Sequence, residues 1–110
     1  MRIATEVRVK ALLRRCGAGG ASAFVVRRGD GERGALFVKI ATLDGRARLL
    51  GPAPASFDAA GEDGALAPHL DPAGAAESDV DAYLARQVEY DPDLWLVEIE
   101  DKAGRSFLDD

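Results

Sequence analysis

Residues 21–50, ASAFVVRRGDGERGALFVKIATLDGRARLL, decide the fold that we expect for this chain. Three apolar runs rich in strand-forming residues lie within this stretch and are separated by glycine-containing turns: 21–28, 35–41 and 46–50. Asp44-Gly45 is a strong signal for a tight hairpin turn, and the Gly-Pro-Ala-Pro segment at 51–54 ends the third run because proline cannot donate to a strand ladder. The stretch therefore predicts a three-stranded antiparallel meander.

A helix is expected on either side of this meander along the chain. Val9, Leu12, Leu13 and Cys16 recur at helical spacing, which predicts a helix over residues 5–18 capped by Thr5. The alternation of apolar and charged residues over 5–11 is also compatible with a strand, so that alternative stays open for the start of the segment.

The second half of the chain predicts one more helix and one more strand. Val80, Tyr83, Leu84 and Val88 form an apolar stripe that predicts a helix from a capping box at Ser78 to the stop at Asp91-Pro92. Residues 94–101 then form a fourth strand. The expected fold class is therefore α+β, with the order helix, three-stranded antiparallel meander, long loop, helix and fourth strand, and with both helices on one face of the sheet.

Length and composition predict how these elements are organised. A chain of 110 residues with 47% hydrophobic residues is expected to form a single domain over residues 1–110. Residues 53–76 consist mostly of Ala, Gly, Pro and acidic residues without Lys or Arg. Because such a segment lacks periodic apolar anchors, we expect a long flexible connection there.

Charge is divided unequally along the chain. Residues 1–52 carry 11 Lys and Arg against 4 Asp and Glu, a net charge of +7, whereas residues 53–110 carry 3 against 15, a net charge of −12. Together these give the net charge of −5 for the whole chain. Such a division is typical either of a basic binding surface or of two halves that compensate each other within one fold.

Strand alternation places much of this charge on one predicted sheet face, opposite a core face that includes Phe24, Val26 and Trp95. The residues of this candidate interaction face are Val25, Phe37, Lys39, Arg46, Arg48, Leu50, Leu96 and Glu98. Its mixture of apolar and charged side chains suggests a surface for an unknown protein partner or for a homodimer. Ion pairs between the basic strands and Glu98 would make the first half of the chain depend on the second.

The sequence provides no recognisable catalytic, cofactor-binding or metal-ligating motif. Cys16 lies on the inner stripe of the first helix, and the only histidine, His69, lies in the segment with the weakest structural pattern, so a buried inert thiol is favoured over a nucleophile. One cysteine and one histidine nearly exclude a zinc site, and Asp91 and Asp93 have an ordinary role at a helix stop. We therefore expect no cofactor and no metal, and we lean against an enzyme.

Several longer segments of the sequence resemble a known bacterial family. These are Ala11 to Arg15, Leu43-Asp44-Gly45, Asp79 to Arg86, and above all Tyr90-Asp91-Pro92-Asp93-Leu94-Trp95-Leu96-Val97-Glu98-Ile99-Glu100-Asp101. Together they resemble the domain of unknown function 1491 family, over nearly the whole chain. The resemblance implies a short bacterial protein of the cytosol, and it implies no activity and no catalytic residue.

Two functions from different classes remain as hypotheses. The first is a small non-enzymatic protein-interaction module of the bacterial cytosol, without a membrane segment, since no apolar run approaches the roughly 18 residues of a membrane span. The second is a nucleic-acid-binding module that uses Arg27, Lys39, Arg46 and Arg48, with Phe37 as a stacking aromatic. The first is favoured because Glu98 would lie in the same plane as these cations. A small enzyme that uses dispersed carboxylates is third.

Overall fold

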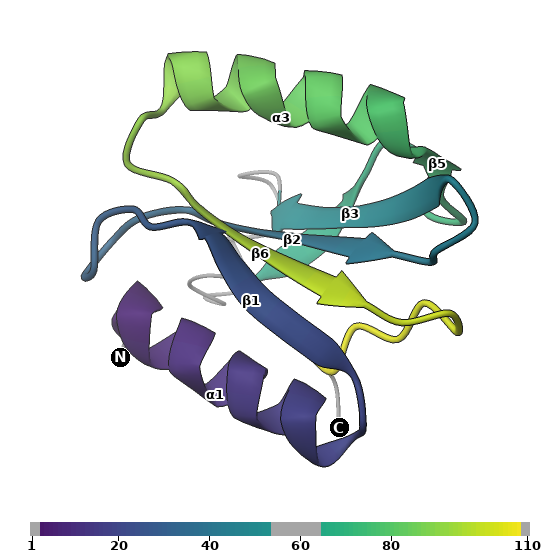
Figure 1. Ribbon diagram of the computed structural model, residues 1–110. Coiled ribbons are helices and arrows are strands. Elements are labelled where there is room, and N and C mark those ends of the chain that lie inside the picture. Colours follow the sequence, from purple (N-terminus) through teal and green to yellow (C-terminus); the bar gives the residue numbers. More distant parts are fainter. Residues whose placement is uncertain (1–2, 54–64, 109–110) are drawn as a thin grey trace.

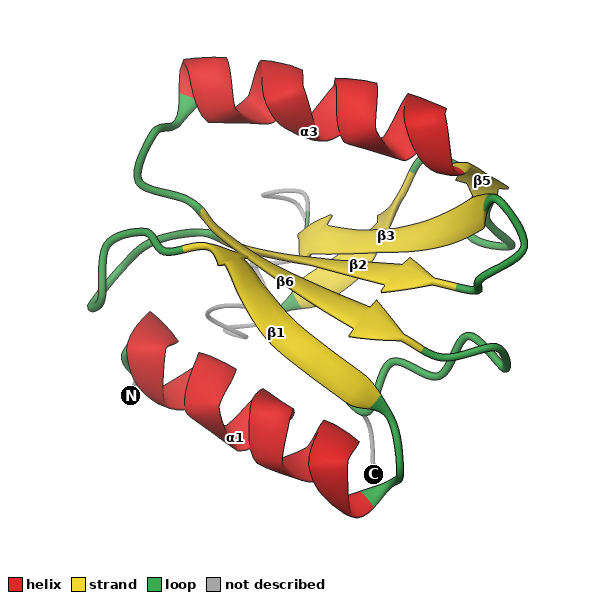
Figure 2. Cartoon of the chain, in the orientation of Figure 1, coloured by secondary structure: helices red, strands yellow, loops and turns green. Residues whose placement is uncertain are grey.

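The computed structural model describes residues 3–53 and 65–108. Two helices and six strands make up this part of the chain (Figures 1 and 2). In chain order they are α1 (Thr5–Ala18), β1 (Ser22–Arg27), β2 (Leu36–Ala41), β3 (Arg46–Pro52), β4 (Leu66–His69), β5 (Ala75–Ala76), α3 (Glu77–Tyr90) and β6 (Trp95–Glu100). The α+β class is confirmed, and the first segment is helical from Thr5 rather than a strand.

The sheet is mixed, and its strand order differs from the predicted meander. The order is β1-β6-β2-β3-β4, with β5 also paired to β3. β2 and β3 form the expected antiparallel hairpin, but β6 lies between β1 and β2, antiparallel to β1 and parallel to β2. The predicted hairpin between β1 and β2 is therefore wrong.

The loop between β1 and β2 crosses over the start of β6, which explains this order. The Asp30 amide donates to the Asp93 carbonyl at 2.9 Å, and the Trp95 indole nitrogen donates to the Asp30 carbonyl at 2.7 Å. Gly29 makes the crossing fit, because a Cβ there would lie 2.1 Å from the Asp93 carbonyl oxygen. Every residue of β2 is buried. A central position in the sheet therefore removes more apolar area of this strand from water than an edge position would.

The two helices cover opposite faces of the sheet, so the prediction that both lie on one face is wrong (Figure 1). One core lies under α1 and is formed by Val9, Leu12, Cys16, Leu36, Val38, Ile40, Leu50, Trp95, Val97 and Ile99. The other lies under α3 and is formed by Phe37, Ala47, Leu49, Val80, Leu84 and Leu94. Because β2 is apolar at successive positions, both of its faces need cover, as in the buried strands of parallel sheets.

Neither helix begins with the side-chain cap that the sequence predicts. Thr5 is the first residue of α1 and fully buried, and its hydroxyl donates to the Gly34 carbonyl at 2.7 Å. α3 begins at Glu77, with Ala76 preceding it, so Ser78 lies inside the helix. Tertiary contacts with the β1–β2 loop, rather than a local cap, thus hold the start of α1.

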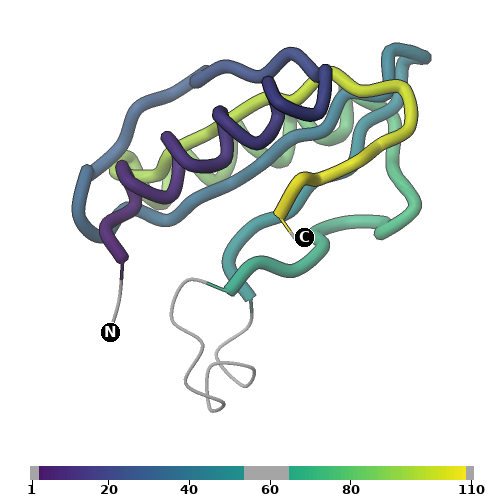
Figure 3. Tube along the Cα trace, turned by 90° about the horizontal axis from the view of Figure 1, so that it is seen from below, coloured from purple at the N-terminus to yellow at the C-terminus, as the bar shows by residue number. Residues whose placement is uncertain are grey.

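Part of the segment predicted as a flexible connection is ordered structure. β4 pairs with β3 from Leu49 to Pro52, and β5 pairs with Arg46 and Ala47 of the same strand. Residues 54–64 of that predicted connection lie outside the described residues. After β6, the chain turns back beneath the sheet toward β3 and β4 (Figure 3). No helix in the described residues is long and apolar enough to cross a membrane.

Candidate functional site

The structure divides the predicted interaction face between the two sides of the sheet. Lys39 pairs with Leu49 and Ile40 pairs with Arg48, so Arg46, Arg48 and Leu50 share the α1 side. Phe37, Lys39, Leu96 and Glu98 lie on the α3 side, while Val25 pairs with Val97 on the α1 side. The prediction pairs β2 with β3 one residue away from the observed register. Because a one-residue shift moves every side chain of a strand to the other face, the predicted face mixes residues from both sides of the sheet.

Two of its apolar residues belong to the interior. Phe37 is only 4% exposed and packs in the core under α3. Leu50 is likewise buried, against the core under α1. A partner therefore has no access to Phe37, and the sheet surface on which we had expected docking is covered by a helix of the same chain.

Lys39 confirms one part of the predicted charge compensation between the halves of the chain. Its ammonium lies 2.7 Å from a Glu77 oxygen, 2.8 Å from an Asp81 oxygen and 3.5 Å from a Glu98 oxygen. Burial alone would lower the pKa of Lys39, but hydrogen bonds to Asp81 and Glu77 and the charge of Glu98 outweigh burial and raise it. The cation is therefore kept charged and joins α3 to the sheet.

The other three basic residues of the nucleic-acid hypothesis, Arg27, Arg46 and Arg48, donate hydrogen bonds to the backbone carbonyls of loops. The Arg27 guanidinium donates to the Pro92 carbonyl at 2.7 Å, and that of Arg46 donates to the Gly74 carbonyl at 2.7 Å. Arg48 donates to the carbonyls of Pro72 and Gly104. With Lys39 buried and the Arg residues on different faces, these four cations share no common surface.

His69 of β4 contacts both α3 and β3. Its Nε2 lies 3.0 Å from the Pro52 carbonyl oxygen, which can only accept, so this nitrogen is the donor. Its Nδ1 lies 2.6 Å from the Tyr83 hydroxyl oxygen, within hydrogen-bond distance, and the ring also packs edge-on against Phe37. Spacing in the sequence could not reveal this contact, because Tyr83 comes from α3 and Pro52 from β3.

The most exposed apolar strand is β1. Phe24, Val25 and Val26 are 43%, 39% and 51% exposed, although Phe24 and Val26 were predicted to be core residues. All three lie on an edge strand, and α3 packs on β3 and β5 at the far side of the sheet, so it leaves Phe24 on its own side of β1 uncovered. We call residues 22–27 together with their unpaired backbone groups the β1 edge.

The two edge strands of the sheet, β4 and β1, differ in how well they are protected against pairing with a further strand. β4 is a four-residue strand that contains Pro68, which suits an edge because proline has no N–H to donate. The β1 edge is six residues long, and its first five residues carry neither charge nor proline. A bulge at Val26 interrupts its pairing with β6, leaving Ser22–Val25 as the regular part. Proteins commonly protect such an edge, since its free backbone groups can pair with another chain.

These features define a class: a small α+β protein with a six-stranded mixed sheet, one helix on each face, and an apolar edge strand whose outer side has no strand partner in the described residues. The chain belongs to a family described as protein of unknown function (DUF1491), whose model matches residues 3–109. This confirms the resemblance found in the sequence. No activity has been assigned to that family by its description.

Solved structures of similar proteins share the fold. A crystal structure of a DUF1491 family protein from Caulobacter crescentus CB15 is 39% identical, with a TM-score of 0.82, and the match covers 99% of this chain and 95% of that one. A solution structure of a protein from A. tumefaciens is 38% identical, with a TM-score of 0.76 over 91% of this chain and 86% of that one. Among curated proteins, none matches this sequence.

Proposed function

We propose that this protein is a non-enzymatic interaction module of the bacterial cytosol whose β1 edge pairs with the β1 edge of a second copy. The observation that carries the proposal is the exposure of Phe24, Val25 and Val26 on a strand whose outer side has no strand partner within the described residues. Adding a strand satisfies the free backbone groups, and the exposed side chains supply apolar area to bury. A reducing cytosol fits the buried free thiol of Cys16.

A second copy is the favoured partner because the strand is complementary to itself. In an antiparallel pair centred on Phe24, Ser22 would oppose Val26 of the other copy and Ala23 would oppose Val25. This register places no like charges opposite each other, whereas like charges directly opposite destabilise a sheet. It also places the two Phe24 rings side by side, and aromatic cross-strand pairs contribute roughly 0.2–1 kcal/mol each.

Light scattering after size exclusion, over a range of protein concentrations, tests the proposal. The natural protein is expected to be dimeric and Phe24→Lys monomeric, since a lysine on an edge strand disfavours pairing. Phe24 pairs with Glu98 across the β1–β6 ladder, so the new cation would meet a carboxylate and the fold should persist. The control is Tyr90→Lys, which adds the same charge at the exposed end of α3 and should remain dimeric.

A natural protein that stays monomeric at millimolar concentration would contradict the proposal. Equal dimerisation of the Phe24 and Tyr90 variants would also contradict it, because the contact would then lie elsewhere. Phe37→Asp, which the sequence alone would suggest for this purpose, would test folding instead, since Phe37 is buried under α3.

A further inference from the structure

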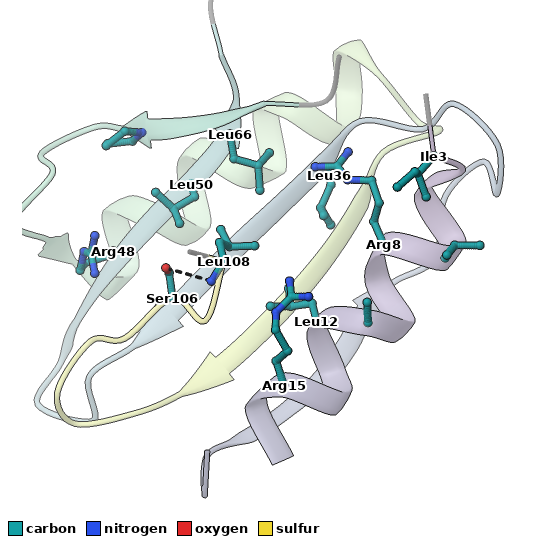
Figure 4. A pocket seen from close by; sticks show the side chains of 13 residues that line it. Ile3, Arg8, Leu12, Arg15, Leu36, Arg48, Leu50, Leu66, Ser106 and Leu108 are labelled. Atoms are coloured by element: carbon teal, nitrogen blue, oxygen red, sulfur yellow. Dashed lines mark hydrogen bonds between the residues drawn. The ribbon is translucent and has the colours of Figure 1, made fainter. Parts of the chain in front are cut away.

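A cavity of about 530 Å³ opens on the α1 side of the sheet, the side opposite to α3 (Figure 4). Its walls come from four separate parts of the chain: α1, β2 with β3, β4, and the stretch after β6. We call it the α1 groove. Its volume lies within the range of roughly 300–1,000 Å³ that is usual for small-molecule sites.

The interior of the α1 groove is aliphatic. Leu12, Leu36 and Leu50 form buried parts of its lining, and Leu66 and Leu108 contribute from β4 and from the C-terminal stretch. Among the described residues that line it, none is aromatic. A nucleobase or other flat ring would therefore find no stacking partner, whereas a hydrocarbon chain would find continuous aliphatic contact.

The charged residues that line the groove are all cationic. They are Arg8, Arg15 and Arg48, and no Asp or Glu lies among the described lining residues. Arg15 donates its Nε to the Phe107 carbonyl at 2.7 Å, and Arg48 donates to the carbonyls of Pro72 and Gly104. Carbonyl groups orient a guanidinium without cancelling its charge, so Arg15 and Arg48 bring positive charge to the described lining of the groove although the chain is net negative.

Arg15 is the best placed of these residues to receive an anion. Its side chain is labelled in Figure 4 beside Leu12, and it extends from α1 toward the middle of the groove. The Nε bond to Phe107 fixes the guanidinium, and its terminal nitrogens, which are further donors, make no hydrogen bond to another residue that the structure describes. A guanidinium can hold a carboxylate through two parallel hydrogen bonds, a geometry that lysine cannot provide.

We infer that the α1 groove binds a straight-chain fatty carboxylate, with the carboxylate on Arg15 and the alkyl chain over Leu12, Leu50 and Leu66. The aliphatic lining selects the chain and the positive rim selects the headgroup. This site is independent of the proposed pairing through the β1 edge, so either can fail without the other.

Titration calorimetry with decanoate below its micelle concentration tests the inference, with NMR chemical shifts locating the site. Binding is expected to be saturable, with one ligand per chain and with the largest shifts at Leu12, Leu50 and Leu66. Decyltrimethylammonium, which has the same chain and the opposite charge, should not bind measurably. Affinity should rise roughly fourfold for each methylene added to the acid, the ratio that corresponds to about 0.8 kcal/mol per buried methylene.

Two variants and a matched control separate the site from non-specific uptake. Arg15→Gln should weaken decanoate binding roughly tenfold or more, as expected for loss of a hydrogen bond to a charged group. Arg14→Gln removes the same charge from the neighbouring exposed position outside the groove, and it should bind within twofold of the natural protein. Leu66→Asp places a negative charge in the groove and should abolish binding even if the Arg15 variant folds poorly.

Four results would overturn the inference, and three of them concern binding strength. These are the absence of saturable decanoate binding up to millimolar concentration, equal binding of the cationic detergent, and equal loss in the Arg14 and Arg15 variants. Shifts confined to the β1 edge would also overturn it, since the ligand would then occupy the exposed strand instead.

Discussion

Replacing Lys39 by methionine removes the buried cation that joins α3 to the sheet while keeping most of its aliphatic length. The Lys39 side chain is only 6% exposed and has three carboxylates around it, from Glu77, Asp81 and Glu98. The variant leaves these carboxylates facing one another without a counter-charge. We therefore expect a large loss of stability from a single substitution that leaves no cavity.

The loss of stability expected for Lys39→Met depends on the hydrogen bonds of Lys39 and on how exposed its partner carboxylates are. Hydrogen bonds between charged groups contribute about 1.5–3 kcal/mol each, and Lys39 makes two, at 2.7 and 2.8 Å. The Asp81 side chain is 57% exposed and can turn to water, whereas that of Glu98 is 18% exposed and has less freedom to do so. The expected loss is thus about 3 kcal/mol, at the lower end of the range for breaking a buried pair. For 110 residues this corresponds to a fall of roughly 12 °C in Tm.

Urea unfolding followed by the fluorescence of Trp95 measures this loss, since Trp95 is the only tryptophan and is buried. The matched control is Lys10→Met, because Lys10 is largely exposed and lies 3.7 Å from Glu6 in an ordinary surface pair. That variant should lose less than about 0.5 kcal/mol. Adding Glu98→Gln to the Lys39 variant should restore part of the stability, because one uncompensated charge is removed. A Lys39 loss below about 1 kcal/mol, or no recovery on adding Glu98→Gln, would refute the reasoning.

Three further outcomes follow from the packing and the charges. Because the folded state raises the pKa of Lys39 above its ordinary 10.5, its contribution is complete below about pH 10.5 and should fall at higher pH; unfolding curves should show this loss in the natural protein and not in Lys39→Met. Gly29→Ala should cost about 2 kcal/mol or more in urea unfolding, because its Cβ would collide with the Asp93 carbonyl, whereas Gly17→Ala meets no atom within 4 Å and should be neutral or stabilising. Cys16 is fully buried and burial raises the pKa of its thiol, so a thiol reagent should label it only in denaturant; rapid labelling of the native protein would show that the helix is not packed as described.

The helices and strands outside the 53–76 segment could be predicted from local patterns. The stripes of α1 and α3 and the apolar runs of β1, β2, β3 and β6 are each contained within about fourteen residues. β4 and β5 could not be predicted in this way, because Leu66–His69 and Ala75–Ala76 are short and have no periodicity of their own. They are strands because β3 offers them an edge with which to pair.

The candidate surfaces could not be predicted from the alternation of residues along each strand, because they depend on how neighbouring strands pair. The pattern of each strand separates its odd from its even residues, but it does not say which set of one strand shares a face with which set of the next. The observed register of β2 and β3 pairs Lys39 with Leu49. This register places Phe37 on the buried α3 side and Arg48 on the α1 side, and a shift by one residue would separate them differently. The α1 groove likewise appears only when four distant segments meet.

By itself the sequence determined the α+β class and the family, and it predicted the ion pair between Lys39 and Glu98. These are properties of composition, of short-range periodicity and of recognisable segments such as residues 90–101. Only the tertiary structure decided that β6 enters between β1 and β2, which makes β1 an edge and exposes Phe24. The physical reason is that strand order depends on how much apolar area each strand buries on both faces, and this depends on every other element of the fold.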